Sequence, residues 1–192
     1  MFSLNEVEAT AKKAARGAGY SWGVADEAGF AARWLTARGV DGCAALAALL
    51  RRMDGVDFNA AKPDMTQDDW AAAGPLCPLL TGCLMSDLGR RDYSIGPVAV
   101  PILVLPFIAG QGGATIETAS GTVTTDGESV CFNGIIDESA SRVIVAAPMV
   151  MPDRLDRSDR ANPDPAAWAT LLAFAHRTYA PATEESRLKG AG

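Results

Sequence analysis

The chain has 192 residues, a formal net charge of −6 and 48% hydrophobic residues. These values are typical of a folded globular protein that is long enough to bury one sizeable core. The negative charge disfavours a nucleic-acid partner, because binding to phosphates requires a basic face.

The sequence predicts a cytoplasmic protein without a membrane partner. Asn5, Glu6 and Lys12 interrupt the N-terminal segment, which therefore lacks the apolar core of a signal peptide. The longest apolar run, 98–109, is shorter than the roughly 20 residues that span a bilayer. In the cytoplasm the four cysteines are expected to be reduced thiols. Their spacing does not match a zinc site, so we predict no metal.

The first predicted helix spans residues 4–16. Ser3 and Glu6 have the spacing of a capping box, in which each side chain accepts a hydrogen bond from the other residue's backbone. Either Gly17 or Gly19 can end this helix, because glycine readily adopts the left-handed conformation of a helix C-cap.

Two further helices follow in the N-terminal half. Ser21 is the expected N-cap of the second, and Asp41 caps a third over residues 42–53. A stripe of small residues on the second helix (Ala25, Gly29 and Ala32) predicts that the first two helices form a tight antiparallel pair.

Residues 54–91 contain weaker signals. We expect a loop over 54–64, then a short helix capped at Thr66 that stops at Gly74. Pro78 favours the first position of another helix, which makes Cys77 its N-cap residue and Gly89 its end.

The pattern changes to strands after Arg91. Residues 97–108 are predicted to form an edge or bulged strand, since Pro101 and Pro106 cannot donate to a sheet. Residues 114–125 alternate in polarity, and 141–151 form a continuous apolar strand.

Two dipeptides, Asp126-Gly127 and Asn133-Gly134, are typical of hairpin turns. The spacing of the segments therefore predicts an antiparallel meander of about four or five strands.

A last helix is expected to begin at Asp164-Pro165 and to cover one side of the sheet, followed by a polar tail over 181–192. The order predicts a single α+β domain: 1–91 mainly helical, 92–152 mainly antiparallel sheet, and a helix over 163–180.

The strongest candidate for a ligand site is the stretch from Arg16 to Gly23. It is not a dinucleotide fingerprint, because a helix rather than a strand precedes it. The free N–H groups that follow Ser21, together with Arg16, could hold a carboxylate or phosphate. The alternative is a plain turn in which the glycines allow a bend and Trp22 fills the core.

Cys77 is the candidate nucleophile, because a thiol at a helix N-terminus can have a lowered pKa. The alternative is a small buried apolar residue. Cys83 should point away from Cys77, while Cys43 and Cys131 fall in apolar patterns that predict core positions. His176 is expected to be a partly exposed residue of the last helix.

Several segments resemble a bacterial family of conserved proteins of unknown function. They are Leu4-Asn5-Glu6, 11–19, Ser21-Trp22-Gly23, Arg33-Trp34-Leu35, 74–78, 181–187 and 190–192. The resemblance implies that the glycine stretch, Cys77 and the tail are recurring signatures. It implies no chemistry and no cofactor.

Two functions follow as hypotheses. In the first, the chain binds a small anionic metabolite through Arg16, Gly19, Ser21 and Trp22, with Cys77 as a catalytic thiol. Ser186 and Arg187 of the tail would then act as a lid. In the second, the chain is a non-catalytic homo-oligomer or accessory subunit, whose alanine and glycine stripes pack helices between chains. The cofactor is left unspecified in both.

Overall fold

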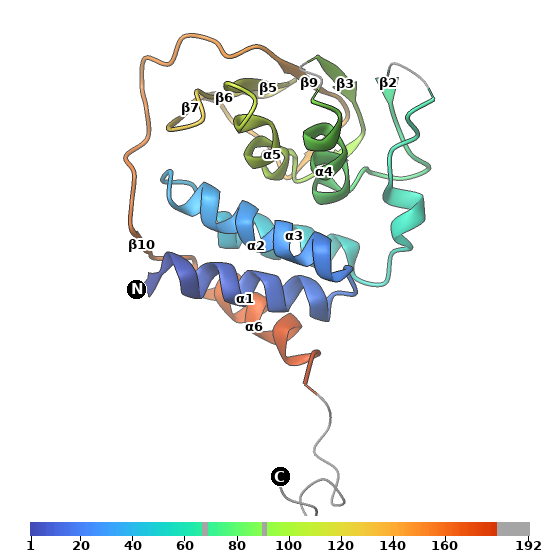
Figure 1. Cartoon of the computed structure of the whole chain (residues 1–192), viewed down its shortest axis with the longest axis vertical. Coiled ribbons are helices and arrows are strands. Elements are labelled where there is room, and N and C mark those ends of the chain that lie inside the picture. Colours follow the sequence, from blue (N-terminus) through green and yellow to red (C-terminus); the bar gives the residue numbers. More distant parts are fainter. Residues whose placement is uncertain (67–68, 90–91, 180–192) are drawn as a thin grey trace, which may run out of the picture.

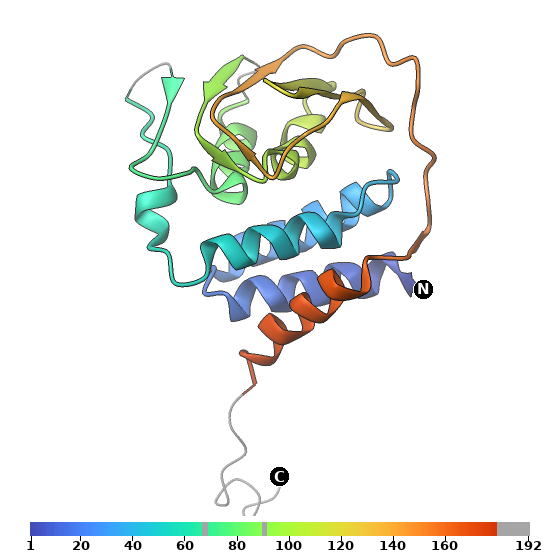
Figure 2. The same ribbon diagram turned by 180° about the vertical axis from the view of Figure 1, so that it is seen from behind.

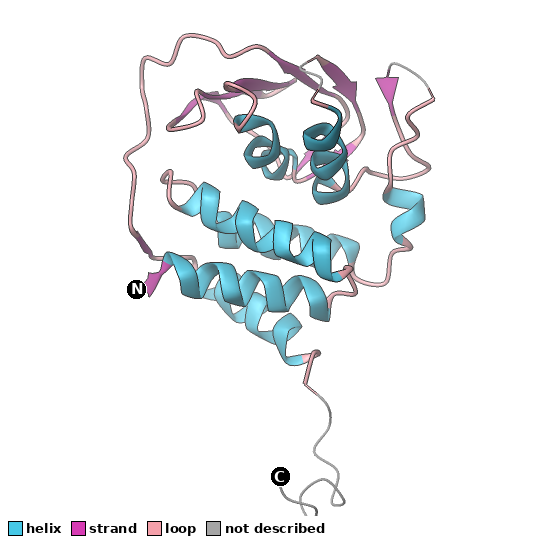
Figure 3. Cartoon of the chain, viewed as in Figure 1, coloured by secondary structure: helices cyan, strands magenta, loops and turns pink. Residues whose placement is uncertain are grey.

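The computed structural model describes residues 1–66, 69–89 and 92–179. It has two layers, a group of long helices and a twisted sheet that carries two shorter helices on its inner face (Figure 1). Helices and strands are largely segregated (Figure 3), which confirms the predicted α+β class.

In the part of the chain that the structure describes, the helical layer consists of four helices. They are α1 (Leu4–Gly17), α2 (Trp22–Thr36), α3 (Gly42–Met53) and α6 (Pro165–His176). Each begins where its capping residue indicates. Ser3 and Glu6 form the predicted capping box, and Ser21, Asp41 and Asp164 each accept a backbone N–H three residues further on.

Small residues allow close approach inside this layer. A Cβ added to Gly29 of α2 would lie 2.9 Å from the carbonyl oxygen of Glu8 in α1, and one added to Gly42 would overlap the carbonyl of Ala32. The predicted tight pairing of α1 and α2 is therefore confirmed. The same contacts show that the stripe around Gly29 packs helices within one chain.

The main sheet has six strands in the order β2-β3-β9-β5-β6-β7. The strands are β2 (Asp69–Trp70), β3 (Tyr93–Ile95), β9 (Val143–Ala146), β5 (Ala114–Thr118), β6 (Gly121–Thr125) and β7 (Val130–Gly134). β5, β6 and β7 form an antiparallel meander, and the expected hairpin at Asp126-Gly127 joins β6 to β7. The turn at 119–120, which divides residues 114–125 into β5 and β6, was not predicted. The sheet is mixed, because β2 and β3 are parallel while its other pairs are antiparallel.

The inner face of the sheet is covered by α4 (Pro78–Leu88), the 3-10 helix η2 (Pro101–Val104) and α5 (Leu105–Ala109). The strand predicted over 97–108 is therefore wrong apart from β4 (Val98–Ala99), which pairs with β8 (Ser139–Ala140). Pro101 and Pro106 lie in the first turns of helical segments, where a missing N–H costs nothing.

Three other expectations differ from the structure. Instead of a helix after Thr66, the chain forms the strand β2, and the preceding loop contains the 3-10 helix η1 (Phe58–Ala61). Gly134 ends β7 without a second tight hairpin, and the strand predicted over 141–151 is limited to β9.

A long connection returns the chain from β9 to the helical layer along one side of the molecule (Figures 1 and 2). It contacts the edge of β7, where Leu155 donates to the carbonyl of Val130 at 2.8 Å. It then forms β10 (Arg160–Ala161), which pairs with β1 (Phe2–Ser3). The helix α6 packs against α1 and α3, on the side away from the sheet, so the expectation that it covers the sheet is wrong.

None of the helices in the described ranges is long and apolar enough to cross a membrane.

Candidate functional site at the turn between α1 and α2

The turn from Arg16 to Gly23 begins as a helix C-cap of the Schellman type. Gly19 has a φ of +98°, the left-handed conformation that glycine adopts without strain. The N–H of Gly19 donates to the carbonyl of Arg16 at 3.0 Å, and the N–H of Tyr20 donates to that of Ala15 at 3.2 Å. Of the two glycines predicted to end α1, Gly19 is therefore the one at which the chain leaves the helix and reverses direction.

The first turn of α2 leaves backbone donors free. The Ser21 hydroxyl accepts from the N–H of Val24 at 3.4 Å, as an N-cap residue does. Within the described residues, the N–H groups of Trp22 and Gly23 have no hydrogen-bond acceptor. The space around Gly23 is open, and no acidic residue occupies this turn. The positive end of the helix dipole is thus uncompensated.

Arg16 places a positive charge beside these donors. Its guanidinium donates to the carbonyl oxygen of Tyr20 and lies over the ring of Trp22, 4.3 Å from the ring centroid. Trp22 is 67% exposed, so the expectation that it fills the core is wrong. Tyr20, which is 1% exposed, fills the core in its place.

Tyr20 connects the turn to Cys77. Its hydroxyl lies 3.3 Å from the Cys77 sulfur, and its ring packs against Phe58 with centroids 4.3 Å apart. The N–H of Cys77 donates to the carbonyl of Ala61 at 2.9 Å. The turn and Cys77 therefore meet in space. Tyr20 was not among the predicted site residues, although the residue after a Schellman glycine often packs on its own helix.

The chemistry expected of Cys77 does not follow from this geometry. Cys77 is the N-cap residue of α4, as predicted, but its exposed fraction is 0%. Burial raises the pKa of its thiol, and this outweighs the opposing effect of the Tyr20 hydroxyl and of the nearby backbone N–H groups of Leu80 and Leu79. The prediction of a lowered pKa is wrong, because the helix-end effect is smaller than the cost of burying a thiolate.

Burial also raises the pKa of Tyr20, with the neighbouring Cys77 as the next cause. Both groups of the pair are therefore neutral near pH 7, and the contact contributes packing and one weak hydrogen bond.

The remaining candidates lie elsewhere. Cys43 and Cys131 are buried as expected, Cys83 is half-buried, and all four thiols are free. His176 is exposed at the end of α6, as expected. The described residues contain no cluster of potential metal ligands. The two tail residues predicted to form a lid, Ser186 and Arg187, lie outside the described residues.

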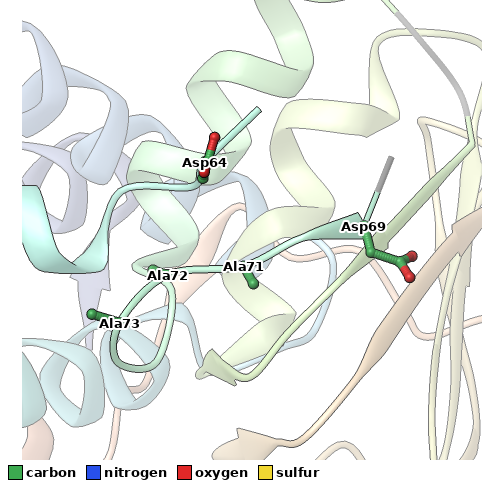
Figure 4. Close-up of a pocket in the computed structure, with 5 residues that line it drawn as sticks. All are labelled: Asp64, Asp69, Ala71, Ala72 and Ala73. Carbon is green, nitrogen blue, oxygen red and sulfur yellow. The ribbon is translucent and has the colours of Figure 1, made fainter. Parts of the chain in front are cut away.

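A separate hollow of about 290 Å³ lies beside β2 (Figure 4). Asp64, Asp69 and three consecutive alanines line it. The Asp64 carboxylate accepts from the N–H of Thr66 at 2.9 Å, and that of Asp69 lies 3.8 Å from Arg142. Figure 4 shows that the two carboxylates do not point toward each other. An acidic lining of this kind does not suit an anion.

Comparison with known proteins supports the resemblance over part of the chain. Residues 2–77 match the model of a family described as "Protein of unknown function (DUF3726)". This range includes α1, α2, α3 and Cys77. No curated protein matches the chain.

One similar solved structure is the malate dehydrogenase from Entamoeba histolytica, at 10% identity and a TM-score of 0.40. The match covers 76% of this chain and 48% of that enzyme, so the chain spans about half the length of the structure it matches. A likeness of this size supports no functional inference.

Proposed function

We propose that the chain binds a small anionic metabolite, a carboxylate or a phosphate, at the N-terminus of α2. The observation that supports the proposal is that the N–H groups of Trp22 and Gly23, which have no acceptor among the described residues, lie beside the guanidinium of Arg16. Backbone donors at a helix N-terminus and a nearby guanidinium both favour an anion.

Each residue of the turn has a role in this proposal. The N–H groups of Trp22 and Gly23 bind the anion, and Arg16 adds the charge. Gly19 allows the chain to reverse direction, so that Arg16 at the end of α1 lies beside the start of α2. Ser21 is the N-cap residue of α2 and leaves the N–H groups of Trp22 and Gly23 for the anion. No catalytic step is assigned to Cys77, because its thiol is buried and protonated.

The test is a titration of the ¹⁵N-labelled protein with inorganic phosphate, followed by NMR. We expect saturable shifts of the Trp22 and Gly23 amides. Arg16→Gln should weaken binding by about tenfold, the effect of losing a charge-assisted hydrogen bond. Arg33→Gln is the matched control, since Arg33 lies in the last turn of α2, away from the proposed site, and pairs with Glu8 at 2.8 Å. Shifts that never saturate, or equal effects of the two variants, would overturn the proposal.

A second candidate is a homodimer formed through α6. This helix contains no Asp, Glu, Lys or Arg, and its outward side presents Ala169, Leu172 and Ala173. Leu172 is 41% exposed. An apolar side on a surface helix favours a partner, and small residues let two copies approach. The stripe around Gly29 does not support this candidate, because it is used between α1 and α2.

Sedimentation velocity tests the dimer. The wild-type chain should sediment with the mass of two copies, and Leu172→Glu should sediment as one, because a buried unpaired carboxylate is costly. Glu8→Gln, a charge change on α1, is the control that should leave the dimer intact. A wild-type monomer at every concentration would exclude this candidate.

A further inference from the structure

A cleft of about 540 Å³ opens between the helical layer and the sheet layer. α2 lines one side, and α5, the end of α4 and the β6–β7 turn line the other. Its volume is within the range of about 300–1,000 Å³ that small-molecule sites have. The cleft shares no lining residue with the turn between α1 and α2, so it is a separate site.

Aromatic and apolar side chains line part of the cleft on both sides. Phe30 and Trp34 come from α2, and Pro106 and Phe107 come from α5. Phe30 is 40% exposed, a large ring left open to solvent on a helix whose neighbouring alanines are buried. Trp34 and Phe107 are largely buried, so Phe30 is the ring that is open to a ligand. An exposed aromatic ring inside a concave surface is typical of ligand sites.

The side chain of Arg38 makes a cation–π contact with one of these rings, that of Trp34. The Arg38 guanidinium lies 3.9 Å from the centroid of Trp34 and donates to the carbonyl of Gly127 at 2.7 Å. Arg38 is therefore held against Trp34 and the β6–β7 turn, and is not among the residues that line the cleft.

Among the described residues, the charged side chains that line the cleft are all acidic. They are Glu27 on α2 and Asp126 and Glu128 on the β6–β7 turn. Asp126 pairs with Arg154 at 2.9 Å and Glu128 with Arg157 at 2.5 Å. Glu27 has no ion pair or hydrogen bond within the described residues, so its charge is available to a ligand.

We infer that this cleft binds an organic cation with an apolar body, such as an amine attached to an aromatic or aliphatic group. The ammonium group lies at the Glu27 carboxylate, and the apolar body packs between Phe30 and Phe107. Carboxylates and aromatic faces both attract ammonium groups, and the apolar side chains of the cleft offer contact to the body of the ligand. This preference is opposite in charge to the anion site, and the two sites are independent.

Isothermal titration calorimetry with three probes of similar shape tests the inference. They are phenethylammonium, the neutral 2-phenylethanol and the anionic 3-phenylpropionate. We expect saturable binding of phenethylammonium, at least about fivefold tighter than 2-phenylethanol and tighter still than 3-phenylpropionate. Inorganic phosphate should not compete, so failure of one site leaves the other testable.

Three variants assign the contact to the cleft. Glu27→Gln should weaken phenethylammonium binding by about fivefold and remove the preference over 2-phenylethanol. Phe30→Ala should weaken both probes, since it removes the shared apolar contact. Asp26→Asn is the matched control, because Asp26 neighbours Glu27 but pairs with Lys12 of α1. Equal binding of the three probes, absence of saturation at millimolar phenethylammonium, or equal effects of Glu27→Gln and Asp26→Asn would overturn the inference.

Discussion

Gly17 and Gly23 lie in the same turn, yet alanine should have opposite effects at the two positions. A Cβ at Gly17 would overlap the carbonyl oxygen of Phe174 in α6 and lie 2.7 Å from its carbonyl carbon. These are backbone atoms, so no side chain can rotate away and α6 must shift. Overpacking of this kind costs about 1–3 kcal/mol, and the backbone contact places Gly17→Ala near the upper end.

Alanine also gains about 0.5–1 kcal/mol over glycine in a helix. Subtracting this gain leaves Gly17→Ala destabilised by about 2 kcal/mol. For a chain of this length, that corresponds to a fall in Tm of about 4–8 °C. Urea unfolding, monitored by circular dichroism, measures this change. The urea concentration at the midpoint should fall, while the dependence of the unfolding free energy on urea concentration stays unchanged.

Gly23→Ala is the control. No atom of the described residues lies within 4 Å of a Cβ at Gly23, so we expect only the helix-propensity gain, and the variant should be slightly more stable than wild type. Wild-type stability of Gly17→Ala would refute the close packing of α1 on α6. A comparable loss in Gly23→Ala would show that the turn itself rejects any side chain.

Three further outcomes test the thiols and the first helix cap. A thiol-specific label at about pH 8 should modify the half-buried Cys83 before the buried Cys77. In urea, labelling of Cys77 should follow global unfolding. Rapid labelling of Cys77 in the native protein would contradict its burial. Ser3→Ala breaks the capping box and should cost about 1 kcal/mol in urea unfolding, so an unchanged midpoint would contradict that role. Burial raises the pKa of Cys43 from 9.0 to about 12. Its contribution to stability is therefore complete below about pH 9 and falls as the pH rises toward the folded-state pKa, because the unfolded thiol ionises first. The urea midpoint should decrease less steeply above about pH 9 in Cys43→Ala than in wild type, and parallel curves would contradict this reasoning.

The helix starts were predictable because their signals are local. Ser3 with Glu6, Ser21, Asp41 and Pro78 each satisfy or remove backbone donors within the next few residues, so no distant contact is needed to place them. The two-layer α+β arrangement followed from the order of these helices and the later strands.

The segment from Pro97 to Ile108 was not predictable in this way. A short apolar run is compatible with a strand or with a buried helix, and periodicity alone does not separate them. The choice depends on distant partners: β4 pairs with β8, and α5 packs against α4. The place of β9 between β3 and β5 is likewise set by pairings across the chain rather than by neighbouring turns.

The candidate site was predictable in part for the same reason. The glycine reversal, the Ser21 cap and the position of Cys77 at a helix start are local features. The contact between Tyr20 and Cys77 joins residues 57 positions apart and has no local signal. The acidic aromatic cleft is assembled from α2, α5 and the β6–β7 turn, which only the folded chain brings together.

Cys77 shows why a helix end alone does not make a thiol reactive. The positive end of a helix stabilises a thiolate only to the extent that the sulfur remains solvated or finds an opposite charge. At Cys77 the Tyr20 hydroxyl and the nearby backbone N–H groups of Leu79 and Leu80 favour the thiolate, yet burial raises the pKa. Arg16, the nearest cation of the turn, is turned outward to the carbonyl of Tyr20 and the ring of Trp22. The turn therefore separates two environments, an inner face where neutral Tyr20 and Cys77 pack, and an outer face where Arg16 and the free N–H groups of α2 can meet an anion.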